Sequence, residues 1–523
     1  MTGTWPSDRR RLLAGGAAVV GAAAAAPLWR QAAARAAGPR LPEGVFGLGI
    51  ASGDPLPDGV VLWTRLAPEP LHGGGMPDRA LPVEWEVAGD ERFAQVVRRG
   101  VAAARPGCAH SVHVEVHGLR PDRPYWYRFR AGGRLSPTGR TRTAPGPRSS
   151  PGGLRLALAS CQNWQHGYFT PYADILRQDP DVVLFVGDYI YESAPSATAV
   201  RRHAGRGEPH TLEQYRNRYA QYRTDPDLAA MHARAPWVVA FDDHEVDNDF
   251  AGRLPQDPGR QSHAAFTARL TAAFRAYYEH MPLRAAAAPS GPHLRMHRRL
   301  DFGRLARLHV LDTRQYRSGR ARTPQGARSP SLSMLGGAQR RWLRDGLRDS
   351  PARWNLVASQ VMMAEADLRA GPGTRWYYDA WDGYRAERTA LLRQFRSVRN
   401  PVVLSGDRHL TMVSDLREDF TDPGSAVVGA EFTGTSVSSN GDEDQAAFHA
   451  LWEPRRADNP HWKLVDAHRG YHLLDIGRDG IDARVRVVDT VLRPSAAAGT
   501  AATLRVEAGR PGVELVRAAA VPE

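Results

Sequence analysis

The sequence predicts an α/β fold, a layered β-sheet sandwich flanked by helices, preceded by an all-β domain of fibronectin or immunoglobulin type. Between about residues 44 and 145, short segments such as 83–87 and 111–116 alternate apolar and polar residues with period two, which is typical of strands. Between residues 153 and 490, continuous apolar runs alternate with helix-like segments, which predicts sheets covered on both faces. A stretch rich in Pro and Gly at 143–153 separates the two patterns and predicts a linker.

The second domain contains six apolar runs that predict buried strands. They lie at residues 154–160, 181–186, 237–241, 306–311, 354–358 and 401–405. Helix-like segments lie between them, at 172–177, 265–280 and 339–349. Two further runs, 470–476 and 483–488, predict a closing hairpin, and residues 491–523 are expected to form a C-terminal extension.

Residues 1–36 predict an export signal and not a folded element. Arg9, Arg10 and Arg11 precede Leu12 and an Ala/Gly/Val run, and small residues at 34 and 36 fit a cleavage site. The paired arginines are similar to a twin-arginine signal, which exports folded proteins; a Sec signal and an uncleaved anchor are the alternatives. We therefore expect export by the twin-arginine machinery to the periplasm, the cell wall or the outside of the cell.

The charge and composition exclude several classes of protein. The formal net charge is +13, but Lys463 is the single lysine and the other 68 basic residues are arginines, which indicates the codon usage of a GC-rich genome. No nucleic-acid recognition motif accompanies this charge, so the sequence does not predict a specific nucleic-acid partner. The mean hydropathy of −0.45 argues against a polytopic membrane protein, and two cysteines cannot build a disulfide scaffold.

Polar side chains follow four of the predicted strands. The blocks are Ser160-Cys161-Gln162-Asn163, Gly187-Asp188-Tyr189-Ile190-Tyr191-Glu192, the acidic segment 242–249 and Gly406-Asp407-Arg408-His409. Ligands of α/β folds bind at the carboxyl ends of strands, so these blocks are expected to converge. The segment 242–249 holds Asp242, Asp243, His244, Glu245, Asp247, Asn248 and Asp249. Such crowded carboxylates repel one another unless a cation neutralises them, which favours a multi-metal site over a solvated acidic loop.

The order of these blocks resembles the calcineurin-like metallophosphoesterases, which carry D-x-H, G-D, G-N-H-E and G-H-x-H at strand ends. Gly187-Asp188, Asp243-His244-Glu245 and Gly406-Asp407-Arg408-His409 match three of them, and Cys161 with Asn163 stands in place of the first. This substituted form resembles the PhoD-type alkaline phosphatase and phosphodiesterase family. Further matching blocks are Ala51-Ser52-Gly53-Asp54-Pro55, Leu311-Asp312-Thr313-Arg314-Gln315-Tyr316-Arg317, Trp381-Asp382-Gly383-Tyr384 and Glu431-Phe432-Thr433-Gly434-Thr435. The resemblance covers about residues 44–490.

The resemblance implies a metal centre with one Fe3+ and two Ca2+ ions. By motif match, Cys161, Asp188 and Tyr191 are expected to bind iron, with Asp188 bridging to calcium. Asp243, Asn248 and Asp407 are expected as oxygen ligands of calcium, and His409 as a ligand of a metal or of the substrate. Iron ligation by Cys161 competes with the alternative that Cys108 and Cys161 form a disulfide after export.

The resemblance also implies an enzyme that hydrolyses phosphate mono- or diesters, and we expect this exported protein to be a monomer that acts in phosphate scavenging. A metal-activated hydroxide would attack phosphorus in line; the alternative is a ligand-bound attacking oxygen with no free water. His244 is the expected general acid, unless it only supports the site, and Arg408 the expected phosphate clamp. Asp312 and Arg314 are expected to order a loop. Two other functions remain open, namely phospholipase D-like cleavage of phospholipid head groups and a non-enzymatic binding module.

Overall fold

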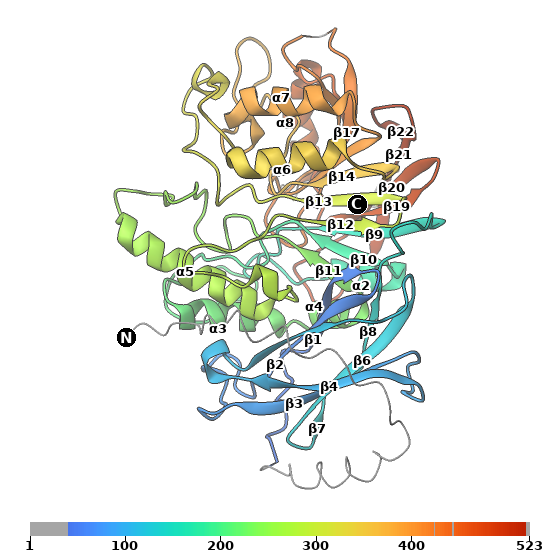
Figure 1. Cartoon of the computed structure of the whole chain (residues 1–523). Helices are drawn as coiled ribbons and strands as arrows, with labels where there is room; N and C mark the ends of the chain where they lie inside the picture. Colours follow the sequence, from blue (N-terminus) through green and yellow to red (C-terminus); the bar gives the residue numbers. More distant parts are fainter. Residues whose placement is uncertain (1–39, 423, 442–443, 519–523) are drawn as a thin grey trace.

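The computed structural model describes residues 40–422, 424–441 and 444–518, so the expected signal at residues 1–36 lies outside the described residues. Two large mixed sheets are stacked with helices outside them (Figure 1). One hydrophobic cluster includes Leu158 of the first sheet and Leu404 and Phe432 of the second, so the two sheets share a core. The α/β prediction is confirmed at this level. None of the helices in the described residues is both long enough and apolar enough to cross a membrane.

The first sheet has ten strands and a parallel centre. Its order is β22 (Glu514–Ala518), β21 (Ala498–Glu507), β20 (Gly480–Val488), β19 (Gly470–Gly477), β9 (Gly153–Ala159), β10 (Val182–Phe185), β11 (Pro236–Val239), β1 (Ile50–Leu56), β2 (Gly59–Arg65) and β5 (Ser111–Val116). The strands β9, β10, β11 and β1 run parallel, so β9, β10 and β11 end at the same edge. The hairpin of β19 and β20 confirms the predicted closing hairpin. The described part of the C-terminal extension supplies β21 and β22, which continue this sheet.

The second sheet has seven strands and contributes the fourth strand end of the site. Its order is β12 (Arg298–Phe302), β13 (Ala306–Val310), β14 (Trp354–Ala358), β15 (Pro401–Ser405), β17 (Val427–Thr433), β16 (Thr411–Arg417) and β18 (Trp462–Asp466). The strands β13, β14, β15 and β17 are parallel. Their residues are almost all buried, which explains the continuous apolar runs of the sequence.

Helices cover the outer faces of both sheets. Residues of α2 (Pro171–Gln178), α3 (Leu212–Arg223), α4 (Pro226–Arg234) and α5 (His263–His280) join the core of the first sheet. Residues of α6 (Gly336–Arg348), α7 (Arg385–Phe395) and α8 (Gln445–Asp458) form a second cluster with β14 and β15. Four short 3-10 turns are η1 (Pro106–Cys108), η2 (Ala285–Ala287), η3 (Gly326–Arg328) and η4 (Trp381–Tyr384).

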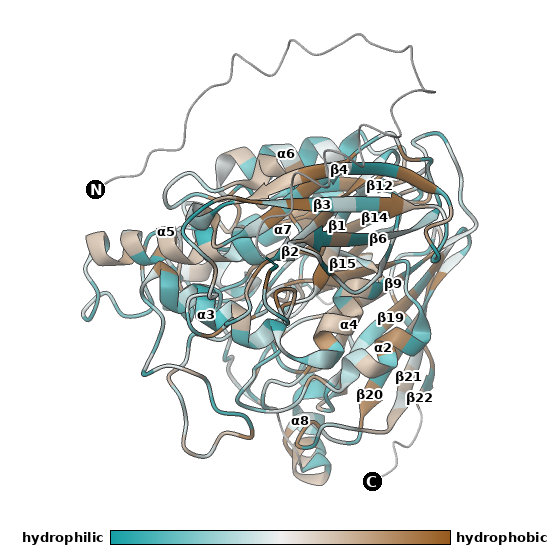
Figure 2. Cartoon of the chain, turned by 90° about the horizontal axis from the view of Figure 1, so that it is seen from below, coloured by the Kyte–Doolittle hydropathy of each residue, from teal (hydrophilic) through white to brown (hydrophobic). Residues whose placement is uncertain are grey.

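Helix α3 was not predicted, because its buried face is not aliphatic. It buries Tyr215, Tyr219 and Tyr222 together with Arg218, and Figure 2 shows it largely in hydrophilic colours. Tyrosine buries a large apolar ring but scores as hydrophilic, so hydropathy periodicity does not detect such a face. A capping box of Thr211 and Gln214 begins the helix.

The described residues before the linker form the strands β1 to β8 and the turn η1. A second layer, formed by β3 (Leu81–Ala88), β4 (Val96–Ala104), β6 (Pro124–Ala131), β7 (Arg134–Leu135) and β8 (Gly139–Arg142), packs against β1, β2 and β5 through a shared core. The first layer does not stand alone, since β1 pairs in parallel with β11 through Ser52 and Gly53. The fibronectin or immunoglobulin type stays a prediction.

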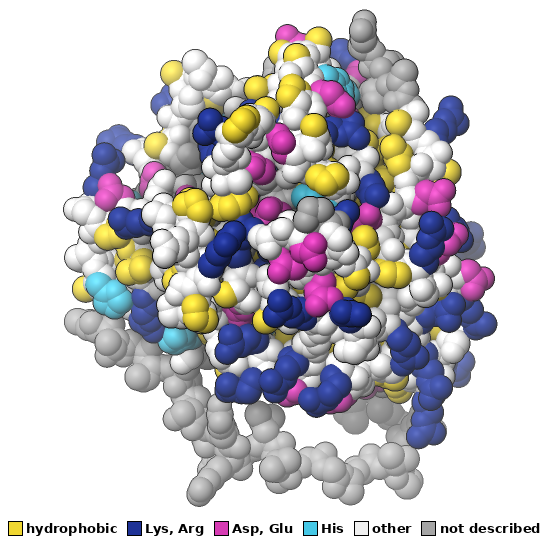
Figure 3. Space-filling model, turned by 90° about the horizontal axis from the view of Figure 1, so that it is seen from above, with side chains coloured by type: hydrophobic (Ala, Val, Ile, Leu, Met, Phe, Trp, Pro, Cys, Tyr) yellow, Lys and Arg dark blue, Asp and Glu magenta, His cyan; other side chains and the backbone are white. Residues whose placement is uncertain are grey.

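Figure 3 shows basic side chains, Lys and Arg, interspersed with acidic side chains on the face seen from above.

Candidate metal centre

The predicted strand ends converge, and several residues there adopt a left-handed backbone. Cys161 follows β9, Asp188 follows β10, and Asp407 and His409 follow β15. Their φ angles are 59°, 60°, 70° and 55°. Such angles cost a non-glycine residue about 1–3 kcal/mol each and occur where a side chain must be aimed at a functional site. The backbone therefore turns sharply after each strand and brings these side chains together.

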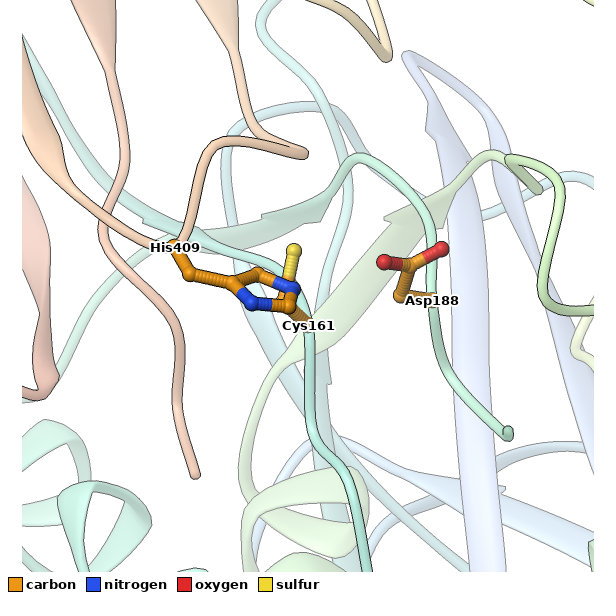
Figure 4. A group of neighbouring side chains, drawn as sticks. All are labelled: Cys161, Asp188 and His409. Carbon is orange, nitrogen blue, oxygen red and sulfur yellow. The ribbon is translucent and has the colours of Figure 1, made fainter. Parts of the chain in front are cut away.

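The first group of potential ligands combines Cys161, Asp188 and His409. Their ligand atoms lie within 4.8 Å of one another, and Figure 4 shows the three side chains converging from separate loops. Tyr191 adds its hydroxyl, which donates to Asp188 Oδ2 at 2.9 Å and lies 3.0 Å from His409 Nε2. His409 Nδ1 is 3.0 Å from the carbonyl oxygen of Asn440, and a proton on Nδ1 leaves the lone pair of Nε2 for Tyr191 or for a metal.

A second, all-oxygen group lies beside the first. Asp242, Asp243 and Asp407 form it, and Asp188 and Asp243 also group with His244, so the two groups are contiguous. Three buried oxygens, Asp188 Oδ1, Asp242 Oδ2 and Asp407 Oδ2, have no hydrogen-bond partner within the described part of the chain. Buried carboxylate oxygens without partners are unfavourable unless a cation binds them. The donor set therefore fits a mixed centre, with sulfur, phenol and imidazole on one side and carboxylates on the other.

The pKa shifts of the candidate ligands also favour a bound cation. Burial, and after it the carboxylates of Asp243 and Asp242, raise the pKa of Asp188 well above its usual range. Burial and the same two carboxylates raise the pKa of Asp407 in the same way. Burial and Asp188 raise the pKa of the Cys161 thiol. A bound cation reverses these shifts, because it favours the ionised form of every ligand around it.

Arg314 forms ion pairs with carboxylates of the all-oxygen group. It is fully buried, and it contacts Asp242 Oδ1 through Nε at 2.5 Å, Asp379 Oδ2 through Nη1 at 2.6 Å and Asp243 Oδ2 through Nη2 at 3.5 Å. Burial opposes ionisation of Asp243, but Arg314 and His244 outweigh it and lower the pKa of this carboxyl. The sequence predicted only a loop-ordering role. Asp312 has that role, since it accepts from the backbone N–H of Arg314 at 3.0 Å.

A third acidic group is balanced by arginines. Asp243, Asp249 and Asp379 bring their carboxylates together, but Arg317 binds Asp379 at 2.8 Å and Arg320 binds Asp249. Asp249 and Asp379 therefore form an ion-pair network with these arginines. Asp379 was missed by the sequence analysis because it follows no strand and lies in an aromatic loop.

Glu192 orients His244. Its Oε2 lies 2.7 Å from His244 Nδ1, and its Oε1 accepts from the backbone N–H of Asn248 at 3.0 Å. Burial opposes protonation of His244, but Glu192 and Asp243 outweigh it and raise its pKa well above the usual value. The sequence analysis placed Glu192 in a strand-end block but gave it no role. Its position four residues after Asp188 was the available signal.

Other predicted residues are placed as follows. The Arg408 guanidinium carbon lies 4.9 Å from the ring centroid of Tyr377, and the Tyr377 hydroxyl donates to Asp249 at 3.2 Å. The expected roles of Arg408 and Asn248 stay predictions. Glu245, one of the potential ligands in the acidic segment, instead accepts from the backbone N–H groups of Asp188 at 3.1 Å and Asp242 at 2.8 Å, and so ties two strand-end loops together.

The two cysteines do not pair. Cys161 is buried in the first group, Cys108 lies half-buried in η1, and both thiols are free. The disulfide alternative is therefore wrong for this structure, and the Cys161 sulfur is available as a ligand.

Comparisons with known proteins agree with the resemblance seen in the sequence. A family model described as PhoD-like phosphatase matches residues 156–485, and one described as its N-terminal domain matches residues 31–145. Alkaline phosphatase D of Bacillus subtilis (strain 168) is 43% identical over 492 residues, which cover 92% of this chain and 84% of that protein. A solved structure described as the structure of PhoD is 42% identical, covers 92% of this chain and 94% of that chain, and superposes with a TM-score of 0.88. The chain therefore belongs to the PhoD-like phosphatase family.

Proposed function

We propose that the protein is a metal-dependent phosphoric ester hydrolase, a phosphatase or phosphodiesterase, whose reaction takes place at the convergence of Cys161, Asp188, Asp243, Asp407 and His409. The observation that carries this proposal is the contiguity of two buried groups, which Asp188 and Asp243 join. The family membership and the names of the similar proteins support the substrate class.

We assign Fe3+ to the first group and Ca2+ to the second. Thiolate, phenolate and imidazole from Cys161, Tyr191 and His409 suit a trivalent transition metal, whereas the oxygens of Asp243, Asp407 and Asn248 suit calcium. Asp188 belongs to the first group and, in a further set with His244, lies beside Asp243 of the second group, so its carboxylate would serve both ions. When bound, the ions would supply Lewis-acid stabilisation of the charge that develops at phosphorus.

The residues of the chain carry the proton transfer and the orientation of the substrate. Because Glu192 accepts from Nδ1–H of His244, the other ring nitrogen, Nε2, is the one that would deliver a proton to the leaving oxygen. The Arg408 guanidinium would bind two phosphate oxygens, with the Tyr377 ring as its support.

The direct test is metal analysis combined with chelation. We expect iron and calcium in the purified protein, hydrolysis of a phosphomonoester or phosphodiester, loss of that activity on chelation and its return when both metals are added back. A choline phospholipid in the same panel tests the head-group alternative. Activity that survives complete metal removal would exclude the proposal.

Changing Glu192→Gln should impair the reaction in a way that depends on the leaving group. General acid catalysis contributes about 10²–10⁴-fold, so we expect a loss of at least about 10²-fold for alkyl phosphate esters, whose alcohols need a proton. Aryl esters with acidic phenols should lose far less. Steady-state rates over a series of leaving groups measure this slope.

The control for this variant is Glu84→Gln on the exposed face of β3, where Glu84 pairs loosely with Arg130. It should leave the slope unchanged. An equal loss for alkyl and aryl esters in Glu192→Gln would remove His244 from the role of general acid.

We further propose that the protein is exported folded, by the twin-arginine pathway, and acts in phosphate scavenging outside the cytoplasm. The candidate ligands come from four strand ends far apart in the sequence, so the metals can bind only after folding. Changing both Arg9 and Arg10 to Lys should retain the protein in the cytoplasm; fractionation that finds it exported as before would refute this route.

A further inference from the structure

Ser439 contacts both Cys161 and Tyr191, two of the candidate iron ligands. It is fully buried in the loop that follows β17. Its Oγ lies 2.6 Å from the Tyr191 hydroxyl oxygen and 2.8 Å from the Cys161 carbonyl oxygen. A serine hydroxyl has one proton to donate, so these two acceptors compete for it.

The carbonyl of Cys161 is already satisfied by other donors. The backbone N–H groups of Ser438 and Ser439 donate to it at 3.3 and 3.1 Å. Two N–H donors match the two lone pairs of a carbonyl oxygen. The hydroxyl proton of Ser439 is therefore left for Tyr191.

Metal ligation would further favour donation of the Ser439 proton to Tyr191 over the Cys161 carbonyl. A Tyr191 oxygen bound to a metal is a phenolate, and hydrogen bonds to ionised acceptors are about twice as strong as neutral ones. Tyr191 and Ser439 are both buried, and the low local dielectric strengthens a hydrogen bond between them.

We propose that Ser439 is a positioning residue for the metal centre, donating a hydrogen bond to the Tyr191 phenolate and so setting the donor strength of this ligand. The inference rests on the proposed function, because it requires Tyr191 to bind ferric iron. A hydrogen bond lowers the energy of the phenolate electrons. The energy of the phenolate-to-iron charge-transfer absorption then rises, and the ferric state is less strongly favoured over the ferrous state.

Removing this donor has measurable consequences. In Ser439→Ala we expect the charge-transfer band to move to longer wavelength and the reduction potential of the iron to fall. Partners that orient metal ligands typically contribute about 10–100-fold to metal affinity, so iron should also be lost at a lower chelator concentration.

The neighbouring serine provides a matched control. Ser438 is equally buried, and its Oγ donates to the carbonyl oxygen of Asn163 at 2.9 Å and not to a candidate ligand. Ser438→Ala removes a hydroxyl of the same size from the same loop, and Ser439→Thr keeps the donor. Melting temperatures of all variants report on folding.

The experiment records iron content, visible absorption and reduction potential of the metal-loaded protein and the three variants. A band shift and a lower potential in Ser439→Ala, with Ser438→Ala and Ser439→Thr close to the unchanged protein, support the inference. Superimposable spectra and potentials for both alanine variants overturn it and leave the proposed function standing. An unchanged protein with iron but no charge-transfer band, or with no iron, overturns the iron assignment and this inference together.

Discussion

Asp188→Asn is expected to abolish phosphate-ester hydrolysis and at the same time to stabilise the metal-free protein. Asp188 belongs to the first ligand group and lies beside Asp243 of the second, so its loss should disturb both ions. Lewis-acid stabilisation by such ions is worth several kcal/mol, which corresponds to a loss on the order of 10³-fold or more. Steady-state rates and metal content measure this part of the prediction.

The expected stabilisation of the metal-free protein by Asp188→Asn follows from the removal of a buried negative charge. Burial raises the pKa of Asp188, and the carboxylates of Asp243 and Asp242 add to this shift. The raised pKa therefore costs folding free energy at every pH above the pKa that Asp188 has in the unfolded chain. An uncharged Asn at this position should therefore raise the melting temperature in chelator. The control is Asp482→Asn on β20, where Asp482 forms an exposed ion pair with Arg505 of β21. It should change neither the hydrolysis rate nor the melting temperature. A lower melting temperature in Asp188→Asn without metal would contradict this electrostatic account.

Arg314→Gln is expected to have the opposite effect on stability. Arg314 is completely buried and pairs with three carboxylates, those of Asp242, Asp243 and Asp379. Its removal takes away the positive charge that balances part of their negative charge. Breaking a buried ion pair typically costs about 3–5 kcal/mol. We expect a loss of this size in the free energy of unfolding of the metal-free protein, measured by chemical denaturation.

Added calcium separates this explanation from a simple packing defect. A cation can partly replace the lost guanidinium charge, so stabilisation by calcium should be larger in Arg314→Gln than in the unchanged protein. Arg348→Gln, an exposed arginine of α6, should behave like the unchanged protein in both measurements. Equal stabilisation of Arg314→Gln and the unchanged protein by calcium would show that Arg314 does not balance the acidic group.

The sequence predicted the strand ends of the site because each combines a continuous apolar run with polar residues directly after it. Cys161, Asp188, Asp243 and Asp407 all came from this local pattern, and the structure brings them together. Asp379 could not be found in this way, since only the fold carries its loop to Arg314.

The pairing between strands far apart in the sequence could not be predicted from local patterns either. No local pattern indicates that Gly53 of β1 lies beside Trp237 of β11. The same limit explains why no role was predicted for Glu192, because its partner His244 follows a different strand. Local periodicity reveals which residues are buried in a strand but does not specify the neighbouring strand.

The pairing of β1 with β11 limits how this protein can be divided. A polypeptide that starts after residue 145 would lack β1, β2 and β5 and would expose the backbone edge of β11, beside the strand end that carries Asp243. It would also lose the ion pairs of Asp54 with Arg298 and of Glu115 with Arg284. An open, apolar edge of this kind invites pairing with other chains. The N-terminal segment is thus no interchangeable module: a shortened catalytic fragment, or a chimaera joined at residue 145, should aggregate unless its partner restores a strand beside β11.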